Sequence, residues 1–196
     1  MTFFWVNIDY LNANFANLSL DEKKSIIFSL DDIRKKLNCD KVLFSINSMT
    51  NIDSIKEFLN DFQTTCTLCG LDFEMGPHFI DEGCFYQETL SGFLELYFRS
   101  RTDKIAWFMN RYPKYKIGGL LLIDENIDYE PIILTKYFKE DTPLLFAHQN
   151  PNFQSYCNKR LQSVCYEVKS GQFLLNATLG INELVNSKSI LNSHKI

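Results

Sequence analysis

Residues 3–8 of the chain read Phe-Phe-Trp-Val-Asn-Ile and are followed by Asp9. This short apolar run predicts a buried strand that presents polar groups at its C-terminal end. Ser19 and Glu22 then form a capping-box pattern ahead of apolar residues spaced by three and four, which predicts an amphipathic helix. Those apolar residues are Ile26, Ile27, Leu30, Ile33 and Leu37. After a break at residues 38–40, a second buried strand is predicted over residues 41–46, and strand, helix, strand is the start of a parallel sheet.

The alternation of helix and strand continues along the chain. A second helix is predicted from about residue 51, because apolar residues up to Phe62 keep the helical spacing. A third begins near Thr102 and ends before Pro113. Residues 118–123 are the most strand-like run of the chain, and residues 142–148 predict another short strand.

Three segments carry weaker patterns. Residues 64–99 begin with a stretch rich in Gly and Cys that has no sustained period, so we expect an irregular cap or insertion there. Residues 165–175 are typical of a hairpin or a bent extended segment, and residues 176–196 of a weak helix with a polar tail. A chain of 196 residues fits one domain, which we expect to comprise residues 1–151 with a C-terminal extension, 152–196, packed on it.

Composition excludes several classes of protein. The chain is 45% hydrophobic. It carries 20 Lys and Arg against 24 Asp and Glu, a net charge of -4, so general electrostatic binding to nucleic acid is not expected. No apolar run approaches the roughly 20 residues of a membrane span, and the first residues lack the features of a signal peptide. We therefore expect a cytoplasmic protein without membrane association whose six cysteines stay reduced.

Polar residues end three of the predicted strands: Asn7 and Asp9 the first, Ser45 the second, and Asp124 and Glu125 the run at 118–123. In an open parallel sheet the ligand crevice lies outside the carboxyl ends of the strands, so these side chains can converge there. Lys104, at the start of the preceding helix, can reach the same place. Carboxylates, a hydroxyl and an ammonium group suit a magnesium-assisted phosphate site, because oxygen ligands hold the hard cation while the hydroxyl and ammonium hold phosphate oxygens.

The order and spacing of these motifs over residues 3–150 resemble the haloacid dehalogenase-like (HAD-like) phosphohydrolases. The stretch 101–108, about twenty residues before Asp124, also resembles the helix that precedes the last motif in small bacterial HAD-like domains. The resemblance implies an α/β fold of three layers, a Rossmann-like parallel sheet with helices on both faces and a small insertion. It assigns Asp9 as the general acid and base and a Mg²⁺ ligand together with Asp124, with Glu125 as a second acidic group, and Ser45 and Lys104 as phosphate ligands.

Asn7 departs from the pattern of the family. It occupies the position of the nucleophilic Asp, while Tyr10 and Leu11 stand where Gly and then Thr or Val are usual. A neutral carboxamide is a poor nucleophile and a poor magnesium ligand, so we expect a protein that binds Mg²⁺ and a phosphorylated small molecule with weak or no turnover. An Asp-to-Asn replacement made to trap a substrate in an ordinary phosphatase would give the same sequence.

A non-enzymatic protein-binding module, a regulatory or toxin-neutralising partner on the same scaffold, is the alternative. Such a binder can let Tyr10 or Leu11 fill the crevice, whereas a ligand-binding protein needs the crevice open. The aromatic residues in or just after the irregular segment would form its binding surface if they are exposed. They are Phe79, Phe85, Tyr86 and Phe93.

A second constellation consists of Cys66 and Cys69, with His78 and Cys84 further on. The Cys-x2-Cys half has the spacing of a structural zinc site, because thiolates and imidazoles are ligands for tetrahedral zinc. The second half matches no common zinc finger. We therefore expect ordinary buried or free cysteines rather than zinc.

Overall fold

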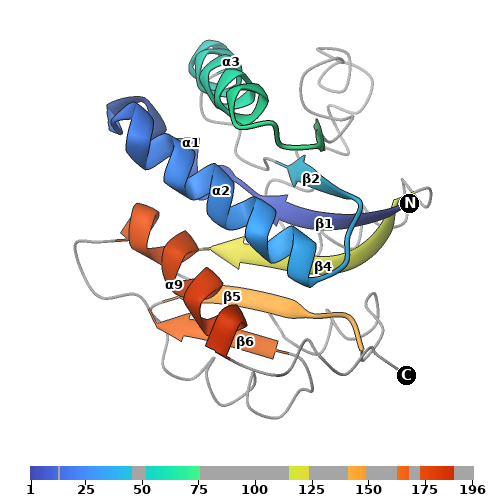
Figure 1. Cartoon of the computed structure of the whole chain (residues 1–196). Coiled ribbons are helices and arrows are strands. Elements are labelled where there is room, and N and C mark those ends of the chain that lie inside the picture. The colour runs from blue at the N-terminus through green and yellow to red at the C-terminus, as the bar shows by residue number, and fades with distance from the viewer. Residues whose placement is uncertain are drawn as a thin grey trace, which may run out of the picture.

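A computed structural model describes residues 1–12, 14–45, 52–75, 115–123, 141–148, 163–167 and 173–187. The described elements are, in chain order, β1 (Thr2–Asn7), α1 (Asp9–Asn12), the 3-10 turn η1 (Phe15–Asn17), α2 (Leu20–Lys36), β2 (Lys41–Ser45), α3 (Ile52–Leu68), β3 (Phe73–Met75), β4 (Lys116–Ile123), β5 (Leu144–His148), β6 (Ser163–Glu167) and α9 (Phe173–Ser187). The expected α/β class is confirmed (Figure 1).

The strands form one six-stranded sheet in the order β3-β2-β1-β4-β5-β6, and every neighbouring pair is parallel. The chain moves outward from β1 through β2 to β3, and then from β4 through β5 to β6 on the other side. The direction of winding therefore reverses between β1 and β4, which are hydrogen-bonded neighbours. This is the strand order of doubly wound, dinucleotide-binding-type sheets, in which ligands bind where the winding reverses.

Helix α2 forms where the sequence predicts it. The Ser19 hydroxyl accepts a hydrogen bond from the Glu22 amide, and the Glu22 carboxylate accepts one from the Ser19 amide, so the capping box is confirmed. The helix ends at Lys36, and Asn38 follows with a φ of 53°, a left-handed conformation that Asn tolerates better than most residues. This turn leads the chain directly into β2.

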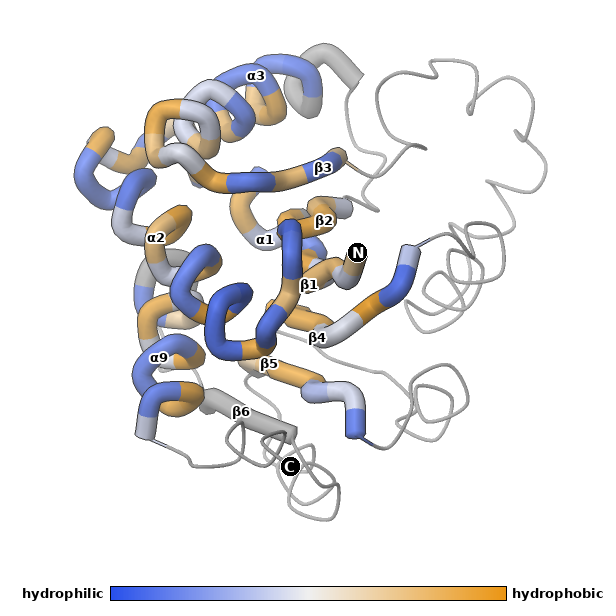
Figure 2. The backbone as a smooth tube through the Cα atoms, turned by 45° about the vertical axis from the view of Figure 1, so that its right-hand side comes forward, coloured by the Kyte–Doolittle hydropathy of each residue, from blue (hydrophilic) through white to orange (hydrophobic). Residues whose placement is uncertain are grey.

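Figures 1 and 2 place the described helices α2, α3 and α9 on one face of the sheet. Phe4, Val6 and Phe44 point to that face and join the main core with apolar residues of the three helices, such as Ile27 and Ile181. Figure 2 shows hydrophobic residues along the central strands and an alternation of hydrophobic and hydrophilic residues along the helices, as amphipathic packing requires.

The other face of the sheet is also buried. Trp5, Leu43, Leu120 and Phe146 alternate with the core residues along their strands, and each is at most 2% exposed. Strands buried on both faces read as continuous apolar runs, which is why residues 3–8, 41–46 and 118–123 gave clear signals in the sequence.

The expectation of an irregular segment beginning at Thr64 is wrong for the part that the structure describes. Helix α3 continues to Leu68, and β3 then pairs in parallel with β2. Thr65 and Cys66 extend the buried side of the helix, and the Thr65 hydroxyl donates to the Asp61 carbonyl 2.9 Å away. Gly70, with a φ of 68°, supplies the left-handed turn after the helix. Residues 76–99 lie outside the described residues.

The C-terminal residues contribute to the same sheet and the same core. Residues 163–167 form β6, which pairs in parallel with β5, and residues 173–175 already belong to α9, so the described part of 165–175 forms no hairpin. Helix α9 begins at Phe173, earlier than its weak pattern indicates, and buries Ala177, Ile181 and Val185 in the core. Among the described residues no helix is long and apolar enough to cross a membrane.

Candidate functional site

Asn7 and Ser45 lie side by side at the C-terminal ends of β1 and β2. They are register partners in the parallel pair, and the Ile8 amide donates to the Ser45 carbonyl 2.8 Å away, which extends the pairing past the end of β1. Both residues are almost fully shielded, with 4% of Asn7 and none of Ser45 exposed. Two residues that the sequence assigns to one site, 38 positions apart, are therefore brought together.

The Ser45 side chain accepts a hydrogen bond from a residue on the same face of the sheet. The indole Nε1 of Trp5 donates a hydrogen bond to Ser45 Oγ over 2.6 Å, and both side chains are buried. Trp5 lies two residues before Asn7, so strand alternation places the two on the same face, opposite α2, α3 and α9. Trp5 is not among the residues that the sequence patterns single out, although the need of a buried indole N–H for a partner is a usable signal.

The turn after β1 directs its apolar side chains away from Asn7 and Ser45. Asp9 opens α1, and the Leu11 amide donates to the Ile8 carbonyl 3.0 Å away. Leu11 is fully buried in the core on the helix-covered face, and Tyr10 packs against the same core. The Tyr10 hydroxyl lies 3.0 Å from Thr178 Oγ1 of α9, and burial raises the pKa of Tyr10 above its ordinary value. Neither side chain fills the side of the sheet that carries Asn7 and Ser45.

The remaining side chains of the expected site are outside the described residues, and only their positions in the sequence relate them to the strands. Asp124 and Glu125 directly follow Ile123, the last residue of β4, and β4 is the neighbour of β1. Asp124, Glu125 and Lys104 lie outside the described residues, as does the side chain of Asp9. The described backbone thus leads from β1 into Asp9 and from β4 into Asp124 on the two sides of the point where the winding reverses.

Cys66 is a core residue. It is fully buried on α3, where desolvation, and to a lesser extent the neighbouring Cys69, raise the pKa of its thiol. Burial also raises the pKa of Cys69, which follows the end of the helix. Within the described ranges no group of three or more His, Cys, Asp or Glu side chains is arranged to hold a metal ion. His78 and Cys84, the other half of the zinc pattern, lie outside those ranges.

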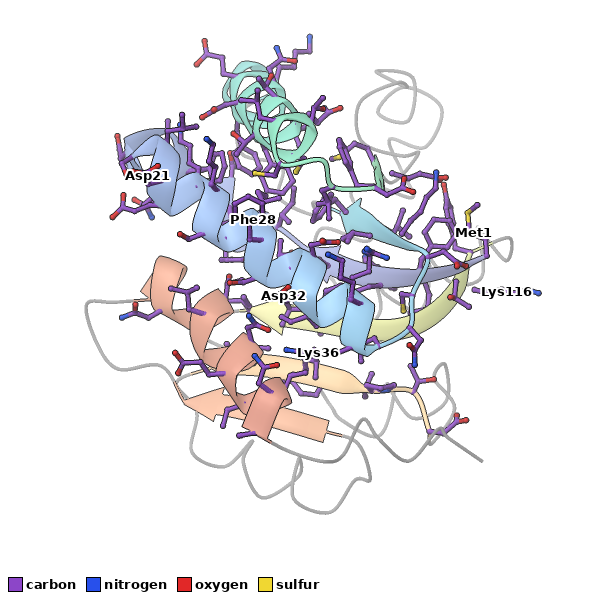
Figure 3. All side chains as sticks on the ribbon, viewed as in Figure 1. Met1, Asp21, Phe28, Asp32, Lys36 and Lys116 are labelled. Carbon is purple, nitrogen blue, oxygen red and sulfur yellow. The ribbon has the colours of Figure 1, made fainter. Side chains whose placement is uncertain are left out.

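The outer side of α2 is mainly charged, with one large apolar residue at its middle. Figure 3 shows Phe28 pointing outward between Asp21 and Asp32, with Lys36 further along the helix. Phe28 is 52% exposed. The aromatic residues considered as a protein-binding surface, Phe79, Phe85, Tyr86 and Phe93, lie outside the described residues.

Comparison of the chain with protein-family models, with curated proteins and with solved structures finds no match in any of the three. The candidate site is therefore defined by its own geometry: a parallel sheet whose winding reverses between β1 and β4, with Asn7 and Ser45 adjacent at the carboxyl edge.

Proposed function

We propose that this protein is a HAD-like, phosphohydrolase-type protein that binds Mg²⁺ and a phosphorylated small molecule, with weak or no turnover. The observation that carries the proposal is the strand order, because it brings the ends of β1, β2 and β4 to one edge around the reversal point. In open α/β sheets that edge is where ligands bind. Side chains at or just after the ends of these strands offer carboxylate oxygens, which a hard cation prefers, and a hydroxyl that can donate to a phosphate oxygen.

Each residue has a role in this proposal. Asp9, Asp124 and Glu125 supply carboxylate oxygens for Mg²⁺, which would neutralise charge on the phosphate when bound. Ser45 and Lys104 contribute a hydroxyl and an ammonium donor for phosphate oxygens. Asn7 is the register partner of Ser45, and in this proposal it stands where a carboxylate would attack phosphorus. Its amide oxygen carries no charge, and weak or absent turnover follows from that.

The packing of Tyr10 and Leu11 favours this function over a purely protein-binding module. A protein binder can let these side chains fill the crevice, but both pack toward the helix-covered core. The Tyr10 hydroxyl is further held beside Thr178 of α9. The protein-binding module remains the alternative that the following experiment distinguishes.

The test restores the missing carboxylate. Asn7→Asp and the unchanged protein are assayed side by side for magnesium-dependent hydrolysis of an aryl phosphate, and we expect activity in Asn7→Asp that Asp9→Ala then abolishes. Asn17→Asp is the matched control, because it introduces the same change at an exposed position in η1. If neither form turns over and magnesium stabilises neither, the protein-binding alternative replaces this proposal.

Thermal unfolding provides a second measurement that does not depend on turnover. Asn7 is only 4% exposed, so a carboxylate there needs a cation nearby to offset its desolvation. We expect Asn7→Asp to be less stable than the unchanged protein without magnesium. Magnesium at one hundred times its Kd should raise the free energy of unfolding of Asn7→Asp by about 2.7 kcal/mol. Asn17→Asp should show no greater response to magnesium than the unchanged protein.

A further inference from the structure

Trp5 and Ser45 form a buried pair on the face of the sheet opposite α2, α3 and α9. The indole Nε1 donates to Ser45 Oγ over 2.6 Å, with 2% of Trp5 and none of Ser45 exposed. Ser45 is the register partner of Asn7, so this bond is built into the edge of the sheet where the proposed ligand binds.

The direction of this bond decides what Ser45 can do. An indole N–H only donates, whereas a hydroxyl has one proton to donate and lone pairs that accept. Because Ser45 Oγ accepts from Trp5, its own proton remains to be donated to another group. The part of the chain that the structure describes shows no acceptor for that proton. A shielded hydroxyl in this state is suited to a ligand that brings oxygen acceptors.

We propose that Trp5 is a positioning residue that fixes Ser45 as a hydrogen-bond donor to a tetrahedral oxyanion, a phosphate group. This inference rests on the proposed function and adds the residue that sets the orientation of the phosphate-binding hydroxyl. The indole also withdraws electron density from Oγ by its own hydrogen bond, which strengthens the donation from Ser45 through cooperativity. A phosphate oxygen bound to Ser45 would be shielded from bulk water. A hydrogen bond to a charged group is stronger in such a shielded place than in water.

The experiment uses the full chain, with inorganic phosphate as the probe in the presence of magnesium. Isothermal titration calorimetry gives the phosphate Kd for the unchanged protein, Trp5→Phe, Ser45→Ala and the double variant. We expect Trp5→Phe to weaken phosphate binding about tenfold, the equivalent of about 1.4 kcal/mol. Once Ser45 is Ala, replacing Trp5 should have little further effect, because Trp5 acts through the Ser45 hydroxyl.

Phe3→Leu separates positioning from packing. Phe3 lies on β1, on the same face as Trp5 but at the far end of the strand, where it contacts Tyr115 instead of Ser45. This variant should lose stability by truncation of a buried ring and keep its phosphate affinity. If Trp5→Phe weakens phosphate binding no more than Phe3→Leu does, Trp5 has only a packing role and the inference is overturned. The same conclusion follows if Trp5→Phe weakens phosphate binding as much when Ser45 is Ala as when Ser45 is present.

An observation on the unchanged protein covers the case in which Trp5→Phe does not fold. The chain has two Trp residues, so ¹⁵N NMR shows two indole N–H signals, and Trp107→Phe assigns the one from Trp5. Phosphate should shift the Trp5 signal because Ser45 changes its hydrogen bonding. Phosphate that binds without shifting it overturns the positioning role and leaves the proposed function intact. If phosphate with magnesium does not bind at all, both fall.

Discussion

The Tyr10 hydroxyl lies 3.0 Å from Thr178 Oγ1, joining the turn after β1 to the last described helix across 168 positions of sequence. Tyr10 directly follows Asp9, and Thr178 is fully buried on α9. The C-terminal helix therefore supports the turn that carries the proposed general acid and base. Residues 173–187 are thus part of the frame of the candidate site.

Removal of one hydroxyl of this pair should leave the other buried without a partner. We expect Thr178→Val and Tyr10→Phe each to lower the free energy of unfolding by about 1–3 kcal/mol. The double variant should lose less than the sum of the two, since it leaves no orphaned group. Urea unfolding of the four proteins measures the coupling, and strictly additive losses would show that the two hydroxyls do not interact.

Gly118 should not tolerate a side chain, because a Cβ at this position would lie 2.7 Å from Cys39 Sγ. It also sits where the register of β1 and β4 shifts, between Phe3 and Phe4. We expect Gly118→Ala to cost about 1–3 kcal/mol, the usual penalty of overpacking. The measurement is the melting temperature, converted with the unfolding enthalpy.

Cys39→Ala provides the control for Gly118→Ala. Removing the sulfur removes the clash, so Gly118→Ala should cost much less in the Cys39→Ala background. An equal cost in both backgrounds would place the strain in the backbone at the register shift instead of at the sulfur.

Asp31 should stabilise the protein at neutral pH and lose that effect in acid. Its Oδ1 lies 2.8 Å from the Arg34 guanidinium and its Oδ2 2.7 Å from Lys35 Nζ. Partial burial alone would raise the pKa of Asp31, but hydrogen bonds from Lys35 and Arg34 outweigh it and hold the pKa below its ordinary value. Asp31→Asn should cost less than about 1 kcal/mol at pH 7, because the cluster is partly solvated.

The sign of the pH dependence follows from the lowered pKa of Asp31. Its contribution is complete above the unfolded-state pKa, about 3.9, and disappears as pH falls through the lower folded-state value. The difference in unfolding free energy between the unchanged protein and Asp31→Asn should therefore shrink as pH falls below about 4. Asp32→Asn is the matched control on the exposed side of α2, where no ion pair to Asp32 is found among the described residues. A constant difference down to pH 2 would contradict the assignment.

Cys66 and Cys69 should differ sharply in reactivity and in structural importance. Because Cys66 is fully buried and Cys69 only partly so, iodoacetamide should label Cys69 first in the folded protein, as followed by peptide mass spectrometry. Cys66→Ala should cost about 1–2 kcal/mol through the cavity it leaves, and Cys69→Ala less. Zinc that protected both thiols from labelling would instead indicate a metal site that includes them.

Much of the fold follows from local sequence patterns. The apolar runs at residues 3–8, 41–46 and 118–123 became β1, β2 and β4, and Ser19 with Glu22 capped α2 as their spacing predicts. The end of α3 did not follow, because the polar Thr65 interrupts the apolar pattern although it is buried in the helix. Thr can satisfy its hydroxyl on the preceding turn of its own helix, and that compensation is invisible to a hydrophobic count.

The sequence by itself determined the local elements and the polar residues that end the strands, because periodicity, caps and turn residues act within a few positions of the chain. Only the tertiary structure decided which ends meet. The strand order puts β1 between β2 and β4, sets Asn7 beside Ser45, and brings Trp5 to Ser45 and Tyr10 to Thr178. These contacts join residues 38 to 168 positions apart, and they depend on how buried faces pack together, which no local pattern encodes.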